Sequence, residues 1–194
     1  MKRPLLTALF GAVVALPAFA ALAPGASAPS FTAQASLAGK EFTYSLKDAL
    51  KKGPVVVYFY PSAFTGGCNI QAHTFAEDMD KFKAAGASVI GVSEDKIATL
   101  NQFSADPQYC AGKLPVASDA SGAIAKSFEI KVAQGPPGLK NTRGDEIGHG
   151  FAERTTFVVT SDGKIVATIG GMAPADNVNK SLETVQQLKS GKAG

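Results

Sequence analysis

Cys68 and Cys110 are the two cysteines of this 194-residue chain, and Cys68 has the surroundings of a nucleophile. It follows a Gly-Gly pair, at the point where an uncharged run of branched and aromatic residues, 54–60, gives way to a helical pattern over 65–85. The apolar residues Ile70, Phe75, Met79 and Phe82 are expected to lie broadly on one face of this helix. Unpaired backbone N–H groups and the helix dipole favour a thiolate at a helix N-terminus. A buried inert thiol and half of a structural disulfide are the alternatives.

Two features of the same segment bear on this cysteine. Thr65 precedes Cys68 by three residues and can aim its hydroxyl at the sulfur. Gly66 and Gly67 let backbone amides approach a small ligand, and they lower the cost of local unwinding. A thioredoxin-like thiol–disulfide exchange protein would need a C-x-x-C motif, which is excluded because Thr65 and Gln71 occupy the positions three residues either side.

The rest of the chain alternates strands and helices around this junction. The pattern predicts an N-terminal hairpin, three strand–helix pairs, a second hairpin with its turn at Asp162-Gly163, and a last helix. This order indicates an α/β fold whose mixed sheet has helices on both faces. A glycine-rich stretch, 130–152, has no clear period and is expected to be a long irregular excursion with a functional or edge-covering use. The predicted segments are 30–37, 41–46, 46–53, 54–60, 65–85, 88–93, 95–104, 114–118, 121–128, 154–160, 165–171 and 176–185.

Residues 1–20 have the pattern of a secretory signal peptide. Lys2 and Arg3 precede an apolar stretch, and the small-residue ending Ala18-Phe19-Ala20 predicts cleavage after Ala20. A membrane anchor is disfavoured, since the apolar run is short and Pro17 interrupts it. Residues 21–29 are expected to be a flexible lead-in, and 30–190 a single domain.

The charge pattern excludes a nucleic-acid surface. Without residues 1–20 the chain keeps 17 basic and 16 acidic residues, a formal charge of +1, and its basic residues are scattered. The hydrophobic content of 45% and the charged content of 18% are those of a globular protein. An exported chain with two cysteines could also be a non-enzymatic domain with one structural disulfide.

Pro61, Thr65 and Cys68 together form the P-x-x-x-T-x-x-C pattern of the peroxiredoxins, which are thiol peroxidases with a thioredoxin-like fold. The setting VVVYFYPSAFTGGCNIQAHTF resembles the bacterioferritin-comigratory, or Q-type, branch. The likeness extends to SAPSFTAQASLAGKEFTYSL, SVIGVSED, LPVASDASGAIAKSF and ERTTFVVTSDGKI, so that it covers roughly residues 28–190.

This resemblance implies a role for each matching residue. Cys68 would be the peroxidatic cysteine that attacks one peroxide oxygen in an in-line displacement, and Thr65 would hydrogen-bond the peroxide and the thiolate. Pro61 would cover the sulfur. Arg154, in ERTTF, would stabilise the thiolate and the charge that develops on the leaving oxygen. Without the resemblance, Arg154 would be read as a solvated charge at a strand edge.

Some positions depart from the family pattern. Gly66 stands where the family often has Pro, and Gln71 where it often has Glu; we expect these changes to affect loop stiffness and the charge at the helix start. His73 occupies the position where one form of the branch has its resolving cysteine. Cys110 is then the remaining candidate, and the resemblance implies an atypical 2-Cys cycle with a Cys68–Cys110 disulfide.

The resemblance also implies partners and a location. Peroxide would be the substrate, as hydrogen peroxide or an organic hydroperoxide, and an exported thioredoxin-like dithiol the reductant of a periplasmic or otherwise exported monomer. No cofactor is implied, and no contact with a membrane after signal removal. His73 and His149 lack an acidic cluster at ligand spacing, so they do not indicate a metal site.

Overall fold

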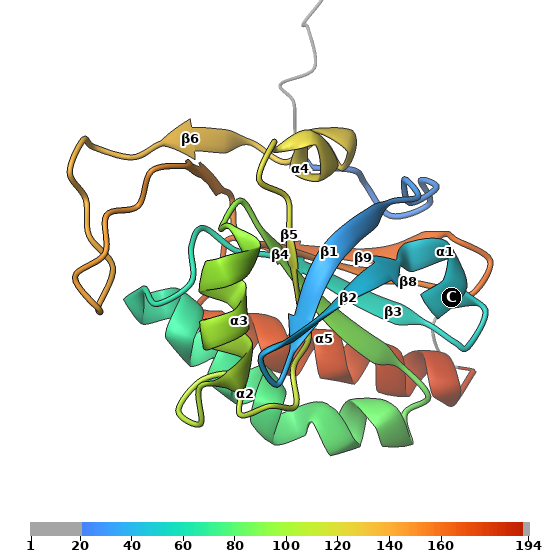
Figure 1. Cartoon of the computed structure of the whole chain (residues 1–194). Coiled ribbons are helices and arrows are strands. Elements are labelled where there is room, and N and C mark those ends of the chain that lie inside the picture. Colours follow the sequence, from blue (N-terminus) through green and yellow to red (C-terminus); the bar gives the residue numbers. More distant parts are fainter. Residues whose placement is uncertain (1–20, 192–194) are drawn as a thin grey trace, which may run out of the picture.

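The computed structural model describes residues 21–191, so the predicted signal peptide lies outside the described residues. A mixed sheet of seven strands forms its centre, in the spatial order β2-β1-β5-β4-β3-β8-β9 (Figure 1). The strands are β1 (Thr32–Leu37), β2 (Lys40–Ser45), β3 (Val55–Phe59), β4 (Ser88–Ser93), β5 (Val116–Ser118), β8 (Thr155–Val159) and β9 (Ile165–Gly170).

The central strand β3 explains why the segment before Cys68 is uniformly apolar. It pairs in parallel with β4 and antiparallel with β8, and all five of its residues are buried. Val56 and Tyr58 face one core, whereas Val55, Val57 and Phe59 face the other. A strand covered on both faces needs apolar residues at every position.

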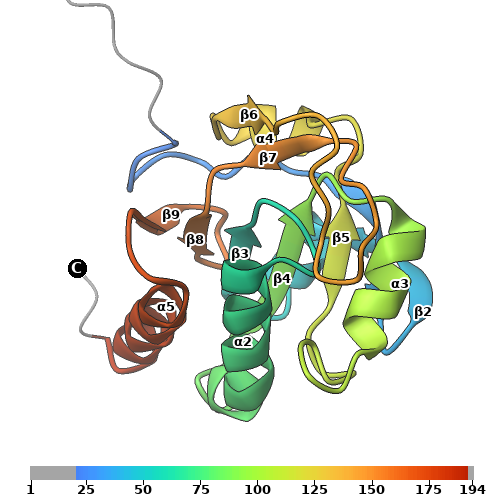
Figure 2. The ribbon, with the colours of Figure 1, turned by 90° about the vertical axis from the view of Figure 1, so that its left-hand side faces the viewer.

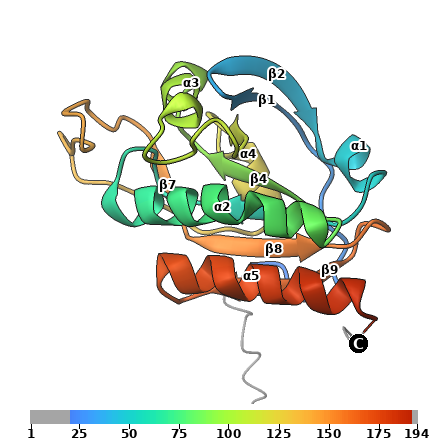
Figure 3. The same cartoon turned by 90° about the horizontal axis from the view of Figure 1, so that it is seen from below.

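The helices cover both faces of the sheet, as the sequence predicts. The core that contains Tyr58 is covered by three helices, with α2 beside α5 (Figures 2 and 3). The other core is covered by two short helices and the N-terminal segment. The first set is α2 (Gly66–Ala84), α3 (Ile97–Ala105) and α5 (Pro174–Lys189), and the second set is α1 (Leu46–Leu50) and α4 (Ala123–Ser127).

Helix α2 shows where the periodicity argument was wrong in one detail. Phe75, Met79 and Phe82 are buried as predicted, but Ile70 is 53% exposed. The inward face instead runs through Cys68, Gln71 and the alanine after it, at the three- and four-residue spacing of a helix. The thiol and a polar side chain thus occupy the inner face that an apolar residue was expected to fill.

Residues 130–152 are more ordered than the pattern indicates. They contain two short strands, β6 (Val132–Gln134) and β7 (Gly150–Ala152), which pair antiparallel as a separate sheet. The loop between them, 135–149, reaches back along the molecule toward α3 and the start of α2 (Figures 1 and 2). The predicted excursion is therefore a long loop that is closed at its base by a strand pair.

The lead-in, 21–29, is attached to the domain by backbone hydrogen bonds. The Gly25 N–H donates to the Ile165 carbonyl at 2.8 Å, and the Ile165 N–H donates to the Ala26 carbonyl at 2.9 Å. The Thr168 hydroxyl donates to the Leu22 carbonyl at 2.6 Å. The segment therefore runs beside β9 rather than leaving the domain.

Candidate active site

Cys68 is the third residue of α2 and lies almost completely buried, with 3% of its surface exposed. Thr65 is the N-cap residue in extended conformation, and the first helical hydrogen bond runs from the Asn69 N–H to the Thr65 carbonyl at 2.8 Å. The N–H groups that precede this bond have no helical acceptor and carry the positive end of the helix dipole. The predicted placement of the thiol in the first helical turn is confirmed.

Arg154 lies between β7 and β8 and reaches the sulfur. Its Nη2 donates to the Cys68 Sγ at 3.4 Å, and its Nη1 donates to the Gln71 Oε1. A guanidinium keeps its charge at any pH of interest and holds several donors in one plane. The structure thus brings together two residues 86 positions apart in the sequence.

The two glycines before Cys68 have different surroundings. A Cβ on Gly67 would lie 3.1 Å from the Arg154 Nη2 and 3.4 Å from the Pro174 ring, whereas a Cβ on Gly66 would meet nothing within 4 Å. The close approach of the helix start to the arginine therefore depends on Gly67. Gly66 adds only backbone freedom.

Thr65 and Pro61 lie in the loop that connects β3 with α2. The Thr65 hydroxyl donates to the Ser62 carbonyl at 2.8 Å, which leaves its oxygen lone pairs free to accept. Pro61 directly follows the buried end of the β3 segment and is itself half-buried. Both residues thus lie in the loop that leads into the helix of Cys68.

Gln71 belongs to this site, which the sequence analysis missed. Its side chain is fully buried, and its Nε2 donates to the Asn177 Oδ1 at 3.0 Å. Asn177 is also fully buried, at the start of α5, and its Nδ2 donates to the Ile169 carbonyl at 3.0 Å. The expectation that Gln71 affects only charge at the helix start is therefore corrected: it contacts Arg154. The sequence did offer one indication: Gln71 is three residues after Cys68, and residues at this spacing lie on the same face of a helix.

Asp95 forms hydrogen bonds with the loop that precedes Cys68. It follows β4, is 4% exposed, and accepts hydrogen bonds from the Ala63 N–H at 2.7 Å and the Ser62 hydroxyl at 3.1 Å. The Ser93 hydroxyl and the His149 Nε2 donate to it at 2.7 and 3.0 Å. Burial alone would raise the pKa of Asp95, but these donors outweigh it and lower the pKa.

His149 connects the long loop to Asp95. Its Nε2 donates to the carboxylate and its Nδ1 donates to the Gly150 carbonyl at 2.8 Å. Both acceptors lack a proton, so the two bonds together require the doubly protonated, charged ring. Burial opposes that charge, but the Asp95 carboxylate and the Gly150 carbonyl outweigh burial and raise the pKa of His149.

The 135–149 loop also contacts Phe64, in the loop before Cys68, and Asp106, in the turn before Cys110. The Thr142 N–H and hydroxyl both donate to the Phe64 carbonyl, at 2.8 and 2.9 Å. The Arg143 guanidinium lies 3.7 Å above the centre of the Phe64 ring and pairs with the Asp106 carboxylate at 2.6 Å. Phe64 is buried and has a positive φ of 57°. Segment 141–149 therefore joins the Cys68 loop to the turn that precedes Cys110.

Cys110 lies in a turn after α3 and is completely buried. Both cysteines are free and belong to the same apolar core, but they are not within disulfide distance. Burial, and to a smaller extent the Asp106 carboxylate, raises the pKa of the Cys110 thiol. Burial is the main cause of the raised pKa of Tyr58, and the thiols of Cys110 and Cys68 add to it.

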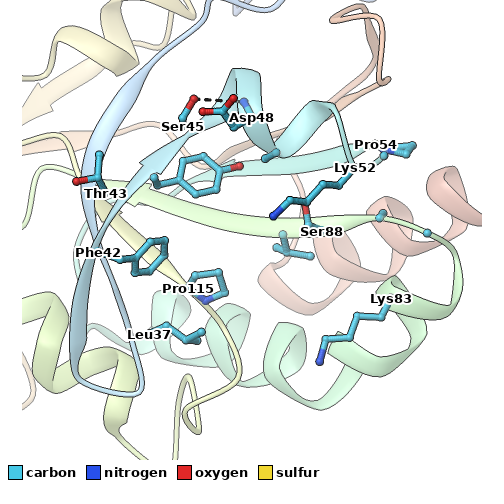
Figure 4. A pocket seen from close by; sticks show the side chains of 16 residues that line it. Leu37, Phe42, Thr43, Ser45, Asp48, Lys52, Pro54, Lys83, Ser88 and Pro115 are labelled. Carbon is cyan, nitrogen blue, oxygen red and sulfur yellow. Dashed lines mark hydrogen bonds between the residues drawn. The ribbon is translucent and has the colours of Figure 1, made fainter.

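Two other features lie along α2 or at its end. His73 is half-exposed and lies 3.4 Å from Glu77 on α2. A cavity of about 670 Å³ opens between the N-terminal hairpin, α1 and the end of α2, where Phe42, Tyr44 and Lys83 line it (Figure 4). Lys83 is 15 residues after Cys68 on a helix that rises about 1.5 Å per residue, so it lies roughly 20 Å from Cys68 along α2.

Within residues 21–191, no group of three or more histidine, cysteine or acidic residues is arranged to hold a metal ion. In the same range, no helix has the length and apolar character to cross a membrane.

Comparison with known proteins identifies the family. Residues 24–168 match the AhpC/TSA family. Peroxiredoxin Q of Sedum lineare is 30% identical over 174 residues, which cover 88% of this chain and 82% of that protein. The crystal structure of peroxidoxin BcpB from Mycobacterium tuberculosis superposes with a TM-score of 0.71 at 27% identity, over 86% of this chain and 98% of that one.

A third relative carries a described activity. The bacterioferritin comigratory protein of Xanthomonas campestris, whose structures concern its alkyl peroxide reduction activity, matches with a TM-score of 0.63 and 27% identity over 80% of this chain and 91% of its own. These neighbours share the thioredoxin-like fold. The thiol at the helix start and the arginine against it thus belong to a chain of the AhpC/TSA family, which includes the peroxiredoxins.

Proposed function

We propose that this chain is a peroxidase that reduces hydrogen peroxide or organic hydroperoxides with Cys68 as its nucleophile. The observation that carries the proposal is the 3.4 Å contact between the Arg154 Nη2 and the Cys68 Sγ at the start of α2. A thiolate is the reactive form, and both the helix dipole and a fixed cation favour it. The alkyl peroxide reduction described for the Xanthomonas relative supports the substrate class.

The chemical step transfers one oxygen atom. The Cys68 thiolate attacks the nearer peroxide oxygen, the O–O bond breaks, and the departing oxygen takes both electrons of that bond and a proton. The products are a sulfenic acid and water or an alcohol. Arg154 stabilises the negative charge as it moves from sulfur to the leaving oxygen, since its donors already point at the site. The Thr65 oxygen accepts a hydrogen bond from the peroxide, and Pro61 shields the sulfur from water.

Cys110 completes the proposed cycle as the resolving thiol of an atypical 2-Cys peroxidase. Its sulfur attacks the sulfenic sulfur of Cys68, a disulfide forms and water leaves. An external dithiol then reduces the disulfide by exchange. Because both sulfurs are buried and apart, the start of α2 and the turn around Cys110 must open before they meet.

The proposed setting is the periplasm or another exported compartment, with a thioredoxin-like dithiol as reductant and a monomeric enzyme. The charged start, the apolar stretch and the small-residue end of residues 1–20 support export. An exported enzyme needs an exported reductant, because the thioredoxin of the cytosol does not reach it.

Stopped-flow mixing of the reduced protein with hydrogen peroxide tests this proposal. Two thiols should disappear per peroxide reduced, and a peptide map should show a 68–110 link. Cys68→Ser should abolish the reaction. Cys110→Ser should still react once and accumulate a sulfenic acid at Cys68, trapped by dimedone.

Two outcomes would contradict different parts of the proposal. Full peroxidase activity in Cys68→Ser would remove the nucleophile and with it the function. An unchanged steady-state rate in Cys110→Ser, with a dithiol as reductant, would remove only Cys110 from the cycle.

A further inference from the structure

Arg154 is held by a chain of hydrogen bonds with a fixed direction. Its Nη1 donates to the Gln71 Oε1, and the Gln71 Nε2 donates to the Asn177 Oδ1 at 3.0 Å. The Asn177 Nδ2 donates in turn to the Ile169 carbonyl at 3.0 Å. The first group can only donate and the last can only accept, so each amide has one possible orientation.

Asn177 is built into the interior as the anchor of this chain. It is fully buried at the start of α5, and its Oδ1 accepts a second hydrogen bond from the Thr156 hydroxyl on β8. Its side chain therefore ties α5 to α2, β8 and β9 at a single point. An amide with its donor and acceptor both occupied has little freedom to rotate.

Besides the Cys68 sulfur, the side chain that Arg154 donates to is the uncharged amide of Gln71. None of the carboxylates in residues 21–191 forms an ion pair with it, whereas Arg143 is paired with Asp106. A carboxylate at position 71 would hold the guanidinium equally well but would neutralise it. It would also place a negative charge three residues from the thiol, on the same face of α2.

We propose that Asn177 and Gln71 are positioning residues that hold Arg154 against Cys68 while leaving the guanidinium charge for the thiolate. Asn177 touches neither the sulfur nor the substrate, and it acts by fixing the orientation of Gln71. Gln71 fixes one arm of Arg154, which leaves the other arm directed at the Cys68 Sγ. This inference deepens the proposed function and rests on it for the peroxide step.

The test measures ionisation of Cys68 separately from turnover. In a Cys110→Ser background, absorbance at 240 nm against pH reports the pH at which half of the Cys68 thiol is ionised, without any peroxide present. Gln71→Glu, which preserves the shape of the side chain, should raise this midpoint by about one pH unit. Asn177→Ala should raise it by less and slow the reaction with hydrogen peroxide about tenfold.

The matched control is Ser181→Ala, one turn further along α5. The Ser181 side chain is equally buried but donates only to the Asn177 backbone carbonyl, at 2.7 Å. It should lower the melting temperature without moving the ionisation midpoint. If Asn177→Ala behaves in the same way, its role is structural and the proposal is overturned.

A double-mutant cycle shows whether Asn177 affects the peroxide reaction through Arg154 or independently of it. In an Arg154→Met background, Asn177→Ala should cause no further loss of rate, because the group that it positions is gone. A full additional tenfold loss would contradict the proposal. An unmoved midpoint in Gln71→Glu, a variant that keeps size and shape, would also overturn it. Failure of Cys68 to react with peroxide in the parent protein would instead contradict the proposed function and leave the midpoint measurement valid.

Discussion

Cys68 and Cys110 lie in the same apolar core and are equally hidden from solvent, but the groups around them differ in charge. Cys68 has a helix N-terminus beneath it and an arginine donor at 3.4 Å. Cys110 has apolar neighbours, and the charge that acts on it comes from Asp106, a carboxylate. Burial and anionic charge both disfavour a thiolate, so Cys110 stays protonated.

This difference shows that accessibility does not assign the roles of the two thiols. The proposed nucleophile, Cys68, is distinguished by the positive charge that folding brings to it, from Arg154 and from the backbone amides of α2. The other gains reactivity only when its turn opens to solvent. In the proposed cycle, the attack on peroxide and the formation of the disulfide are therefore separated by a conformational step, and changes near either cysteine test this difference.

Removal of the arginine should have the largest effect. Arg154→Met should slow the reaction of Cys68 with hydrogen peroxide about 100- to 1,000-fold, because a preorganised donor to the developing charge is lost. The rate is measured by stopped-flow fluorescence or by competition with a second peroxidase. Arg143→Met is the matched control, since Arg143 pairs with Asp106 and contacts Phe64. An equal loss in both variants would contradict a specific role for Arg154.

A methyl group at residue 67 should have the next largest effect. Gly67→Ala should slow the peroxide reaction about tenfold, because its Cβ would lie 3.1 Å from the Arg154 Nη2 and displace the guanidinium. Gly66→Ala meets nothing within 4 Å and should leave the rate near that of the parent. Equal rates in the two variants would show that the arginine adjusts without cost.

The pair of His149 and Asp95, which contacts the loop before Cys68, should make the stability of the protein depend on pH. Because folding raises the pKa of His149, the charged ring stabilises the protein fully below pH 6.5, the ordinary histidine pKa. This stabilisation is lost as pH rises through the pKa of the folded protein. Because folding lowers the pKa of Asp95, its carboxylate stabilises the protein fully above pH 3.8, the ordinary aspartate pKa. This stabilisation is lost as pH falls through the pKa of the folded protein. Urea unfolding at pH 5 should show His149→Gln about 1 kcal/mol less stable than the parent.

As pH rises through the raised pKa of His149, the difference between His149→Gln and the parent should shrink, since a neutral ring can no longer donate from both nitrogens. His73→Gln provides the control, because His73 is half-exposed on α2. A gap of constant size from pH 5 to pH 9 would mean that the charge on His149 contributes nothing.

The smallest effect concerns Cys110. Asp106→Asn removes the anionic contribution to the raised pKa of the thiol but leaves burial, which is the larger cause. In a Cys68→Ser background, alkylation of Cys110 by iodoacetamide should therefore accelerate only about two- to threefold. Acceleration of a hundredfold would show that Asp106, with its partner Arg143, holds the turn closed. The size of the increase therefore distinguishes an effect of Asp106 on the pKa of the thiol from an effect on the opening of the turn.

Much of the fold followed from local pattern. The uncharged run at 54–60 predicted the central strand because a strand covered on both faces needs apolar residues throughout. The Asp-Gly turn predicted the β8–β9 hairpin, and Gly163 has the required positive φ of 84°. The helix start at Cys68 followed from the same local signals, so the position of the thiol could be read before the structure.

The parts that could not be predicted depend on contacts between distant segments. Gln71 reads as a polar residue on a helix, and only its burial against Arg154 and Asn177 shows that it orients the site. His149 reads as a loop histidine until Asp95, 54 residues away, is found beside it. Ile70 was placed on the wrong face because the polar Gln71 occupies the inner one. Hydrophobic period carries no information about such polar pairs.

The backbone of Phe64 has an energetic consequence for the proposed cycle. A bulky residue at φ = 57° is strained by roughly 1 kcal/mol, which the contacts of its buried ring and of Thr142 compensate in the closed loop. When the loop unwinds, Phe64 returns to an ordinary conformation and this energy is recovered. The population of the open loop is then about fivefold larger than it would be with a relaxed residue there. In the proposed cycle, the loop that holds Cys68 for attack on peroxide thus stores part of the energy needed to open it.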